Sequence, residues 1–519
     1  ASCRRSGGRF RPRPHTSRHA RIVADSNLAL VLRVDRDAGP KVGGVRGIAP
    51  EASASDRRRS KKTNTMGVLS LLLKHPGDLV PLLKVKRMAD KAKKLPKEPN
   101  LAFCYDMLNK VSRSFAIVIQ QLPHELQDAV CIFYLVLRAL DTVEDDMSIP
   151  DEVKCPELEV FHERIYDKKY VYPCGEKHYK VLMDEYPKVT AVFLSLKKEY
   201  RDVIADITKR MGEGMSNFIR REVVTLKDWN EYCHYVAGLV GIGLSNLWAS
   251  SMLEDKRFAD MEDLSNSMGL FLQKTNIIRD YLEDIVEEPA PRMFWPKCVW
   301  SKYAKTLDAF QYPENRTKAV HCANHLITNA LEHADASLEY MSSLKNVDVF
   351  RFCAIPQVMA IATLAECYEN GKVFEGVVKI RRGLSARIML ECLDIYDVAR
   401  MFKTYARAID AKIAKDDPNA NKTRKQLNNV HAKCDDILAS DTQGFGKKFD
   451  PVMPFVLRLL VLLMTLLYAA YAFRIGGVRE AVGIAAPGTG VAVVDKAEMA
   501  FSVIAVGAAS VFFATGHFF

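Results

Sequence analysis

The spacing of apolar residues constrains the fold of this chain most. From residue 101 onward, apolar residues recur at intervals of three and four residues almost throughout, and runs of alternating β-branched residues are few. This period places apolar side chains on one face of a helix, so we predict an all-α fold, a bundle of helices. The predicted helices cover residues 101–111, 125–145, 189–221, 228–251, 259–287, 316–344, 354–370 and 388–414. A loop-rich excursion between the first two long helices is predicted by Pro150, Pro156, Pro173 and Pro187.

Four carboxylates lie within the six residues 141–146, directly after an apolar run. On a helix, Asp141, Glu144 and Asp145 share one face. Clustered carboxylates repel one another unless a cation supplies the missing charge, and magnesium is a cation that accepts oxygen ligands. For this run alone, a solvated acidic helix end is an equally good interpretation.

A second polar stripe favours the metal site. Asn276, Asp280 and Asp284 recur every four positions and therefore form one stripe on a helix. Two such stripes on separate helices could face each other across a cavity and hold metal ions against a diphosphate. We predict a site for a departing diphosphate, with Mg²⁺ held by Asp141, Glu144, Asp145, Asp280 and Asp284.

Two other segments have both a structural and a functional interpretation. Arg113 follows Ser112 before a turn, and its planar guanidinium suits a phosphate, although an N-cap serine beside a surface arginine is the structural alternative. Farther on, Gly238, Gly241 and Gly243 lie within one helical segment, where each glycine costs roughly 1 kcal/mol relative to alanine. They indicate either close helix packing or room for a long prenyl chain.

Taken together, these motifs closely resemble those of the squalene synthase family, in its plant and algal type. The resemblance runs from about residue 66 to residue 379 and beyond, with the motifs in order and unbroken. Its motifs occupy residues 112–115, 141–146, 232–241, 276–284 and 352–357. It implies a class I isoprenoid synthase fold for residues 66–414.

The resemblance also implies roles for individual residues. The substrate contacts would be Ser112, Arg113, Phe115, Tyr134 and Arg138. The catalytic residues, placed around the carbocations, would be Tyr232 and Phe352. The cofactor-binding residues would be Asn276, Lys379 and Arg381. The chain contains no dinucleotide-binding fingerprint, so the prediction of NADPH rests on the resemblance alone.

The implied activity is head-to-head condensation of two farnesyl diphosphates to presqualene diphosphate, followed by NADPH-dependent reduction to squalene, the first committed step of sterol biosynthesis. A phytoene or dehydrosqualene synthase would share only the first half-reaction, and the cations from Lys379 to Arg382 favour squalene. A chain-elongating prenyltransferase or terpene cyclase would lack the segment from Tyr232 to Gly243. An inactive membrane-tethered homologue is the third alternative, against which the intact carboxylates count.

Charge is unevenly distributed along the chain. Residues 1–65 contain sixteen Lys and Arg against five Asp and Glu, so their net charge equals the +11 of the whole chain. The rest is formally neutral, and no nucleic acid partner is expected. We interpret residues 1–65 as a disordered extension, either a transit segment or a stretch before the true start at Met66. The twelve cysteines include no Cys-x-x-Cys pair, which favours a reducing compartment.

The C-terminal region predicts membrane attachment. Residues 415–450 are polar and are interpreted as a tether. Residues 451–519 are interpreted as an anchor, because 452–473 and 499–519 are each nearly long and apolar enough to span a bilayer. The second segment either crosses back or lies at the interface. The catalytic unit is expected to lie in the cytosol, because Lys447 and Lys448 precede the first apolar segment. It is also expected to be monomeric. The resemblance implies that the membrane is that of the endoplasmic reticulum.

Overall fold

The computed structural model describes residues 75–287 and 291–441. Within these residues, those from Pro81 onward belong to one compact unit and residues 75–80 belong to a second. The predicted extension at residues 1–65 and the predicted anchor at residues 451–519 lie outside the described residues. The helices that build the candidate site all lie in the unit that begins at Pro81.

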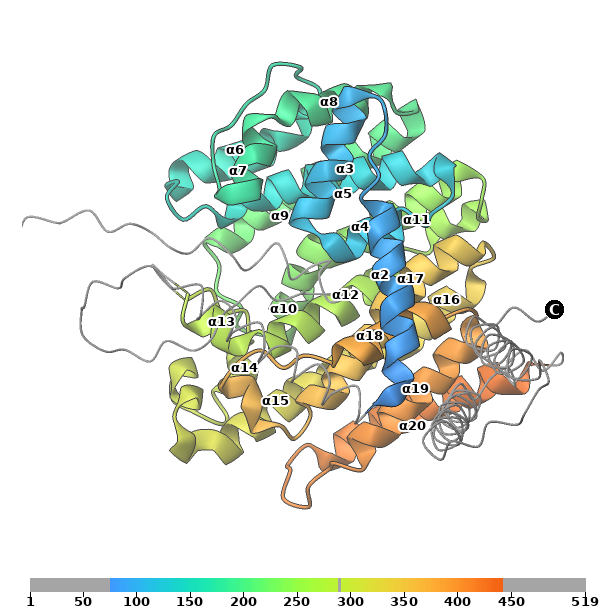
Figure 1. Ribbon diagram of the computed structural model, residues 1–519. Helices are drawn as coiled ribbons and strands as arrows, with labels where there is room; N and C mark the ends of the chain where they lie inside the picture. Colours follow the sequence, from blue (N-terminus) through green and yellow to red (C-terminus); the bar gives the residue numbers. More distant parts are fainter. Residues whose placement is uncertain (1–74, 288–290, 442–519) are drawn as a thin grey trace, which may run out of the picture. The chain divides into compact units, whose positions relative to one another are not determined.

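The prediction of an all-α fold is confirmed, since the described residues form helices and no strand (Figure 1). The first half contains α2 (Leu79–Ala92), α3 (Pro99–Val111), α4 (Arg113–Ile119), α5 (His124–Asp145), α6 (Asp151–Arg164), α7 (Lys177–Asp184), α8 (Tyr186–Ser195), α9 (Lys198–Ile219), α10 (Leu226–Cys233) and α11 (Leu239–Ser251). The second half contains α12 (Glu262–Arg279), α13 (Tyr281–Ile285), α14 (Lys297–Trp300), α15 (Arg316–Ala330), α16 (Ala334–Ser343), α17 (Val347–Cys367), α18 (Arg382–Glu391), α19 (Ile395–Asp410) and α20 (Ala420–Ala439). Short 3₁₀ segments are η1 (Pro76–Asp78), η3 (Lys256–Asp260), η4 (Leu307–Gln311), η5 (Pro313–Asn315), η6 (Leu331–His333) and η7 (Gly371–Phe374), whereas η2 (His234–Gly238) is π-helical.

Helix α12 packs against helices from both halves of the folded unit. It contacts α10, η2 and α11, which precede it, and α15, α16 and α17, which follow it. Its last seven residues, 273–279, are all buried. Burial of polar groups is costly unless they are satisfied, so the polar residues at this end of α12 need partners from other helices or from a ligand.

Helices α5 and α12, which carry the two acidic stripes, both pack against α11. The residues of α5 from Ala129 to Glu144 are buried without interruption, and the helix contacts α3, α8, α9 and α11. Helix α11 in turn contacts both α5 and α12. Two segments that lie more than 100 positions apart in sequence are thereby held within one core.

The glycines of the η2–α11 segment serve close helix packing. A Cβ atom at Gly241 would lie 2.4 Å from the backbone oxygen of Ser265 on α12. In the reverse direction, a Cβ at Gly269 would lie 2.4 Å from the backbone oxygen of Ala237. Since backbone atoms cannot move aside as a flexible side chain does, only glycine permits this approach. The close-packing interpretation is therefore confirmed here, and Gly241 also lines a cavity described below.

Several predicted helix boundaries were wrong. The predicted helix 189–221 is divided into α8 and α9, and the predicted helix 388–414 is divided into α18 and α19. The excursion after Pro150 also contains two helices, α6 and α7, and Pro156 lies inside α6. Proline inside a helix removes one backbone hydrogen bond, but the buried Leu158 and Phe161 on α6, which packs against α9, compensate for that loss.

The prediction of a polar tether at residues 415–450 was wrong for its central part. Residues 420–439 form α20, which packs along α19 (Figure 1). The polar composition concealed an apolar stripe at helical spacing, in which Leu427, Val430, Cys434 and Ile437 are buried. The folded unit therefore extends beyond the predicted boundary at residue 414.

Helix α17 is the one helix, among the residues described, that is long and apolar enough to cross a membrane. In the folded unit, 83% of its most apolar window is buried. It contacts α12, α16, α18 and α19, so its apolar residues are those of a core helix. The segments 452–473 and 499–519, on which the prediction of an anchor depends, lie outside the described residues.

Candidate active site

The first acidic stripe is buried at the C-terminal end of α5. Asp141 and Glu144 are 6% and 3% exposed, and Asp145 is half-buried. Asp141 Oδ1 and Glu144 Oε2 have no hydrogen-bond partner. Burial raises the pKa of Asp141 to about 8, and it also raises the pKa of Glu144. These carboxylates lack the water that would stabilise their charge, so they need a cation to remain ionised together.

Arg292, which the sequence analysis missed, supplies such a cation. Its Nη1 lies 2.5 Å from Asp145 Oδ1, and its Nη2 lies 2.9 Å from Glu144 Oε1. Its backbone N–H donates to the backbone oxygen of Asp284 at 3.2 Å. Arg292 therefore connects the first stripe with the second. A single arginine in a proline-rich segment carries no helical period, so the sequence offered no signal for this role.

The second stripe keeps its alignment across the junction of α12 and α13. The backbone N–H of Asp280 donates to Asn276, and that of Asp284 donates to Asp280, so the period of four residues continues. Asp280 pairs with the neighbouring Arg279, at 2.8 and 2.5 Å. Burial, then the charge of Asp280, raises the pKa of Asp284 well above its ordinary value. Both polar side-chain atoms of the buried Asn276 lack partners.

These residues suit a hard cation, although they do not form a closed metal cluster. Within residues 75–287 and 291–441, no three His, Cys, Asp or Glu side chains converge closely enough to hold a metal ion. Guanidinium groups balance part of the charge instead. The donors are all oxygens, and those of Asp141, Glu144 and Asn276 include buried atoms without partners. Magnesium prefers oxygen ligands and takes some of them from substrate phosphates, so an incomplete protein set fits it.

Arg138 is held at the edge of the first stripe. Its Nη2 donates to Tyr134 Oη at 3.0 Å, and its Nη1 lies 3.7 Å from Asp141 Oδ2. Its guanidinium carbon also lies 5.5 Å from the ring centroid of Tyr134 and 5.7 Å from that of Tyr179 on α7. Tyr179 was not predicted from the sequence. This packing fixes a cation beside the carboxylates, where it can contact an anionic group.

Aromatic side chains from four helices lie next to this edge. Phe115 packs against Tyr134 and Phe352, with ring centroids 6.1 and 6.3 Å apart. Phe352 then packs edge-on against Trp248 at 5.6 Å. The structure thus brings together Phe115, Tyr134 and Phe352, which are far apart in sequence. Aromatic rings of this kind stabilise a nearby positive charge without hydrating it.

Two adjoining apolar cavities open from these rings. The smaller one has Arg138 and Asp141 in its wall. The larger one extends toward Trp248 and Tyr340. Both cavities are lined by Val240, Leu244 and Phe352. An apolar chain with a charged end could therefore lie in either cavity and approach the acidic stripes at its charged end.

Tyr232 lies close enough to the first stripe to interact electrostatically with Glu144 and Asp145. Its ring stacks on Phe294 with centroids 4.0 Å apart, and its buried hydroxyl has no partner. Burial, then the charge of Glu144, raises the pKa of Tyr232 well above its ordinary value. The phenol therefore stays protonated. Phe294 comes from the same segment as Arg292, so this segment covers both the phenol and the first stripe.

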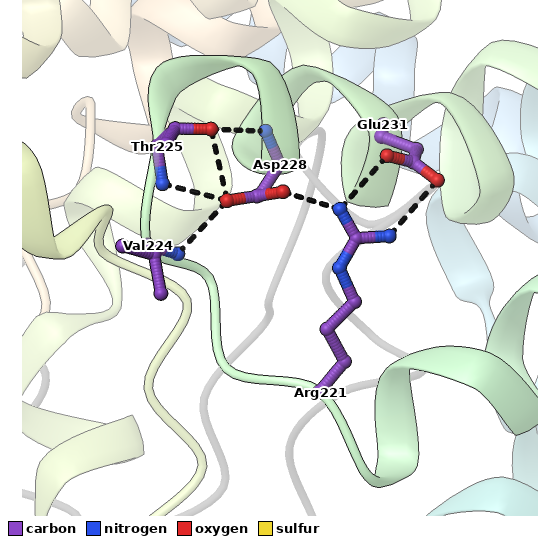
Figure 2. A network of polar contacts seen from close by, with 5 residues as sticks. All are labelled: Arg221, Val224, Thr225, Asp228 and Glu231. Carbon is purple, nitrogen blue, oxygen red and sulfur yellow. Dashed lines mark hydrogen bonds and ion pairs between the residues drawn. The ribbon is translucent and has the colours of Figure 1, made fainter.

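A capped turn precedes α10, the helix that carries Tyr232, and Figure 2 shows the polar contacts of this turn. Thr225 and Asp228 form a capping box, in which each side chain accepts the other's backbone N–H. Arg221 pairs with Asp228 and, at 3.0 Å, with Glu231. Hydrogen bonds from Thr225, led by its backbone N–H, lower the pKa of Asp228 to about 2. The anionic cap therefore persists at neutral pH and stabilises the first turn of the helix that carries Tyr232.

The structure brings the remaining predicted site residues together less closely. Ser112 is the C-cap of α3 and the N-cap of α4, and its buried hydroxyl has no hydrogen-bond partner among the described residues. Arg113 is the first residue of α4, but its side chain lies outside the description. Lys379 is exposed, and Arg381 is the N-cap of α18. Burial, then the charge of Arg387, lowers the pKa of Arg381. These two cations lie on a different segment from the stripes.

Comparisons with known proteins show the family to which the chain belongs. The chain matches the family Squalene/phytoene synthase over residues 108–383. It is 57% identical over 372 residues to a squalene synthase of Nicotiana benthamiana, covering 72% of this chain and 90% of that protein. It is 53% identical over 401 residues to squalene synthase 1 of Arabidopsis thaliana, covering 77% and 98%.

An algal relative and solved structures give the same result. Squalene synthase LSS of Botryococcus braunii is 51% identical over 417 residues, covering 79% of this chain and 90% of that protein. The solved complexes of TcSQS with the ligands E5700 and BPH1237 both superpose with a TM-score of 0.64 at 47% identity. Each superposition covers 65% of this chain and 99% of that chain.

Proposed function

Because the chain belongs to the squalene/phytoene synthase family, we propose that it joins two farnesyl diphosphates head to head to presqualene diphosphate and then reduces this intermediate to squalene. The relatives confirm the plant and algal type that the motifs predicted. The TcSQS structures confirm the expected fold.

The observation that carries the proposal is the position of the two stripes. Buried carboxylates from α5 and from the α12–α13 junction are connected by Arg292. The smaller apolar cavity begins beside the first stripe, and the larger one adjoins it at Val240, Leu244 and Phe352. A polar centre that binds diphosphate, next to two apolar cavities, fits two substrates that each combine a diphosphate with a long hydrocarbon chain.

The metal-holding residues in this proposal are Asp141, Glu144, Asp145, Asp280 and Asp284. Magnesium bound there would neutralise charge that develops on a departing diphosphate. The carboxylates orient the diphosphate end of each substrate toward one side of the cavities. Asn276, whose amide has no hydrogen-bond partner among the described residues, can donate to a diphosphate oxygen or accept from a cofactor.

The arginines around the stripes assist ionisation of the substrate. Arg138 lies at the wall of the smaller cavity, and Arg292 lies between the stripes. A guanidinium can bind two oxygens of a phosphate at once and stays charged at any physiological pH. When diphosphate leaves, these groups hold it away from the allylic cation, which the double bond of the second substrate then attacks.

The cavity walls keep water from the cations. They are lined mainly by aliphatic and aromatic side chains, with Phe352 common to both cavities. An allylic cation in contact with water would be captured as an alcohol, so a dry cavity directs the reaction toward carbon–carbon bonding. Phe115 and Phe352 stabilise the positive charge through their ring faces.

Tyr232 assists proton loss in the first half-reaction. Its raised pKa keeps the phenol neutral, so its oxygen can accept a proton only while it passes its own to a carboxylate or diphosphate oxygen. The carboxylate of Glu144 interacts electrostatically with this phenol. In the second half-reaction the reducing equivalent is a hydride, which NADPH supplies when bound. The exposed Lys379 and half-buried Arg381 would contact its phosphates.

The chain would act at a membrane. The segments 452–473 and 499–519 are the proposed anchor. This anchor would lie in the endoplasmic reticulum membrane, with the catalytic unit on the cytosolic side. This location suits a reaction whose substrate is amphipathic and whose product is a hydrocarbon that leaves into the bilayer.

Product analysis tests the proposal. Full-length protein in membranes is incubated with farnesyl diphosphate and magnesium, with and without NADPH. Squalene should form with NADPH, whereas presqualene diphosphate should accumulate without it. A dehydrosqualene-type product under both conditions would indicate an enzyme without reduction. Absence of any condensation product from a folded protein would indicate an inactive homologue.

A further inference from the structure

The larger apolar cavity has a defined far end. Val240, Leu244 and Trp248 line it from α11 at intervals of four residues, so they follow one side of that helix. Val240 and Leu244 also line the smaller cavity, whose wall includes Asp141, whereas Trp248 does not. Trp248 lies roughly 12 Å along the helix from Val240, at 1.5 Å per residue. The Trp248 end is therefore distant from the carboxylates.

Tyr340, on α16, lines this cavity together with Trp248. Its hydroxyl lies 2.7 Å from Ser245 Oγ, and Ser245 Oγ also donates to the backbone oxygen of Gly241 at 2.9 Å. The Tyr340 ring packs edge-on against Phe258, with centroids 5.3 Å apart. Tyr340 and Phe258 are both buried, at 2% and 0% exposure. A ring held at its hydroxyl and at its edge cannot rotate away to lengthen the cavity.

We propose that Tyr340, held by Ser245, determines the length of the prenyl chain that this cavity accepts. The inference rests on the proposed assignment of the two cavities to the two substrate chains. A chain longer by one isoprene unit would have to displace the Tyr340 ring and break its hydrogen bond. The ring and an isoprene unit are similar in size, so removing the ring provides space for one additional unit.

Tyr340 lines only the larger cavity. The smaller one is lined by other residues, which include Phe133 and Met211. Removing the Tyr340 ring should therefore lengthen one of the two substrate sites. The expected new product combines one fifteen-carbon and one twenty-carbon chain. As in squalene formation, two diphosphates leave, one proton is lost in the first half-reaction, and one hydride from NADPH is added in the second.

The experiment supplies membranes that contain the full-length enzyme with equal concentrations of farnesyl and geranylgeranyl diphosphate, magnesium and NADPH. The hydrocarbons are separated by chain length. With Tyr340→Ala, the ratio of thirty-five-carbon to thirty-carbon product should rise about tenfold or more, the scale at which apolar pockets discriminate chain length. The forty-carbon product should remain minor. Because the readout is a ratio, partial loss of stability does not obscure it.

Three variants make the result specific. Tyr340→Phe keeps the ring but removes its hydrogen bond with Ser245, so its product ratio should lie between those of the parent and of Tyr340→Ala. Tyr340→Leu opens the cavity with less loss of packing, and it decides the matter if the alanine variant does not fold. Tyr186→Ala removes an equally buried tyrosine on α8 that lines neither cavity. It should keep the parent ratio.

An unchanged ratio in the folded Tyr340→Ala or Tyr340→Leu enzyme would overturn the inference. So would an equal rise in Tyr186→Ala, or a forty-carbon product that exceeds the hybrid. Failure of the proposed function is distinguishable, because the parent enzyme would then form no squalene from farnesyl diphosphate alone.

Discussion

Arg292 Nη2 lies 2.9 Å from Glu144 Oε1, although the two residues are 148 positions apart in sequence. This pair, together with the bond from the Arg292 backbone to Asp284, joins the two acidic stripes. Both side chains are largely buried, since Arg292 is 12% and Glu144 is 3% exposed. A buried ion pair of this kind matters most when one partner is removed, because the other is left as an uncompensated charge.

Removing Arg292 should therefore destabilise the metal-free enzyme. We expect Arg292→Ala to lower the free energy of unfolding by about 3 kcal/mol in chelator, the scale for breaking a buried pair. Magnesium should restore part of this loss if it binds the same carboxylates. Urea denaturation with and without magnesium measures both effects. Arg221→Ala is the control, because its ion pairs are more exposed. Equal losses in both variants would contradict this assignment.

Neutralising one ligand of either stripe should stop both half-reactions. Asp141→Asn and Asp280→Asn keep the side-chain size but remove a charge from the proposed diphosphate site. Since each half-reaction begins with loss of diphosphate, we expect a decrease in kcat of at least about 100-fold, typical for loss of one electrostatic group. Diphosphate release and product formation are measured separately. Near-normal turnover of either variant at ordinary magnesium concentrations would refute the metal assignment.

Stability without metal should fall as pH rises through the range in which Asp141 titrates. Its pKa is raised from 3.8 to about 8, so in this range the folded protein retains a proton that the unfolded chain has lost. Unfolding then releases a proton, and a higher pH favours the unfolded state. Denaturation in chelator between pH 4 and about 8 measures this slope. Asp141→Asn should flatten it, and an unchanged slope would argue against this origin.

The two half-reactions should separate when Lys379 and Arg381 are replaced. The double alanine variant should accumulate presqualene diphosphate at limiting NADPH and recover squalene as NADPH is raised, because only the second half-reaction needs hydride. The lost contacts correspond to a few kcal/mol of binding, the scale of charge-assisted hydrogen bonds. Lys372→Ala, at a nearby exposed lysine on η7, is the control. Equal loss of both half-reactions would assign these cations to folding or to diphosphate binding.

A truncated chain of residues 66–446 should be soluble and active. It keeps α20, which packs on the folded unit, and lacks the two long apolar segments at the C-terminus. The reactions proposed above use only residues within it. Sedimentation after cell lysis and squalene formation measure the two properties. A well-folded truncated protein that cannot release diphosphate would show that the removed segments contribute to the chemistry.

The acidic stripes could be predicted from the sequence because their geometry is local. A helix fixes which residues share a face, so Asp141, Glu144 and Asp145 form one stripe without reference to the rest of the molecule. The all-α class follows from the same period. The period did not show where helices divide, or that the polar residues 420–439 form a helix. Those features depend on contacts with α19 and other helices, which are non-local.

Only the tertiary structure decided how the site is assembled. Arg292, Tyr179 and Phe294 have no periodic or compositional signal, and each acts through a partner at least 40 residues away in sequence. Tyr340 in the wall of the larger cavity is likewise held by a hydrogen bond with Ser245, 95 positions away in sequence. The sequence determined which faces of which helices are acidic or apolar, because that is set by local backbone geometry. Which faces meet, and which cation lies between them, was decided by packing, because burial of apolar surface is a property of the whole fold.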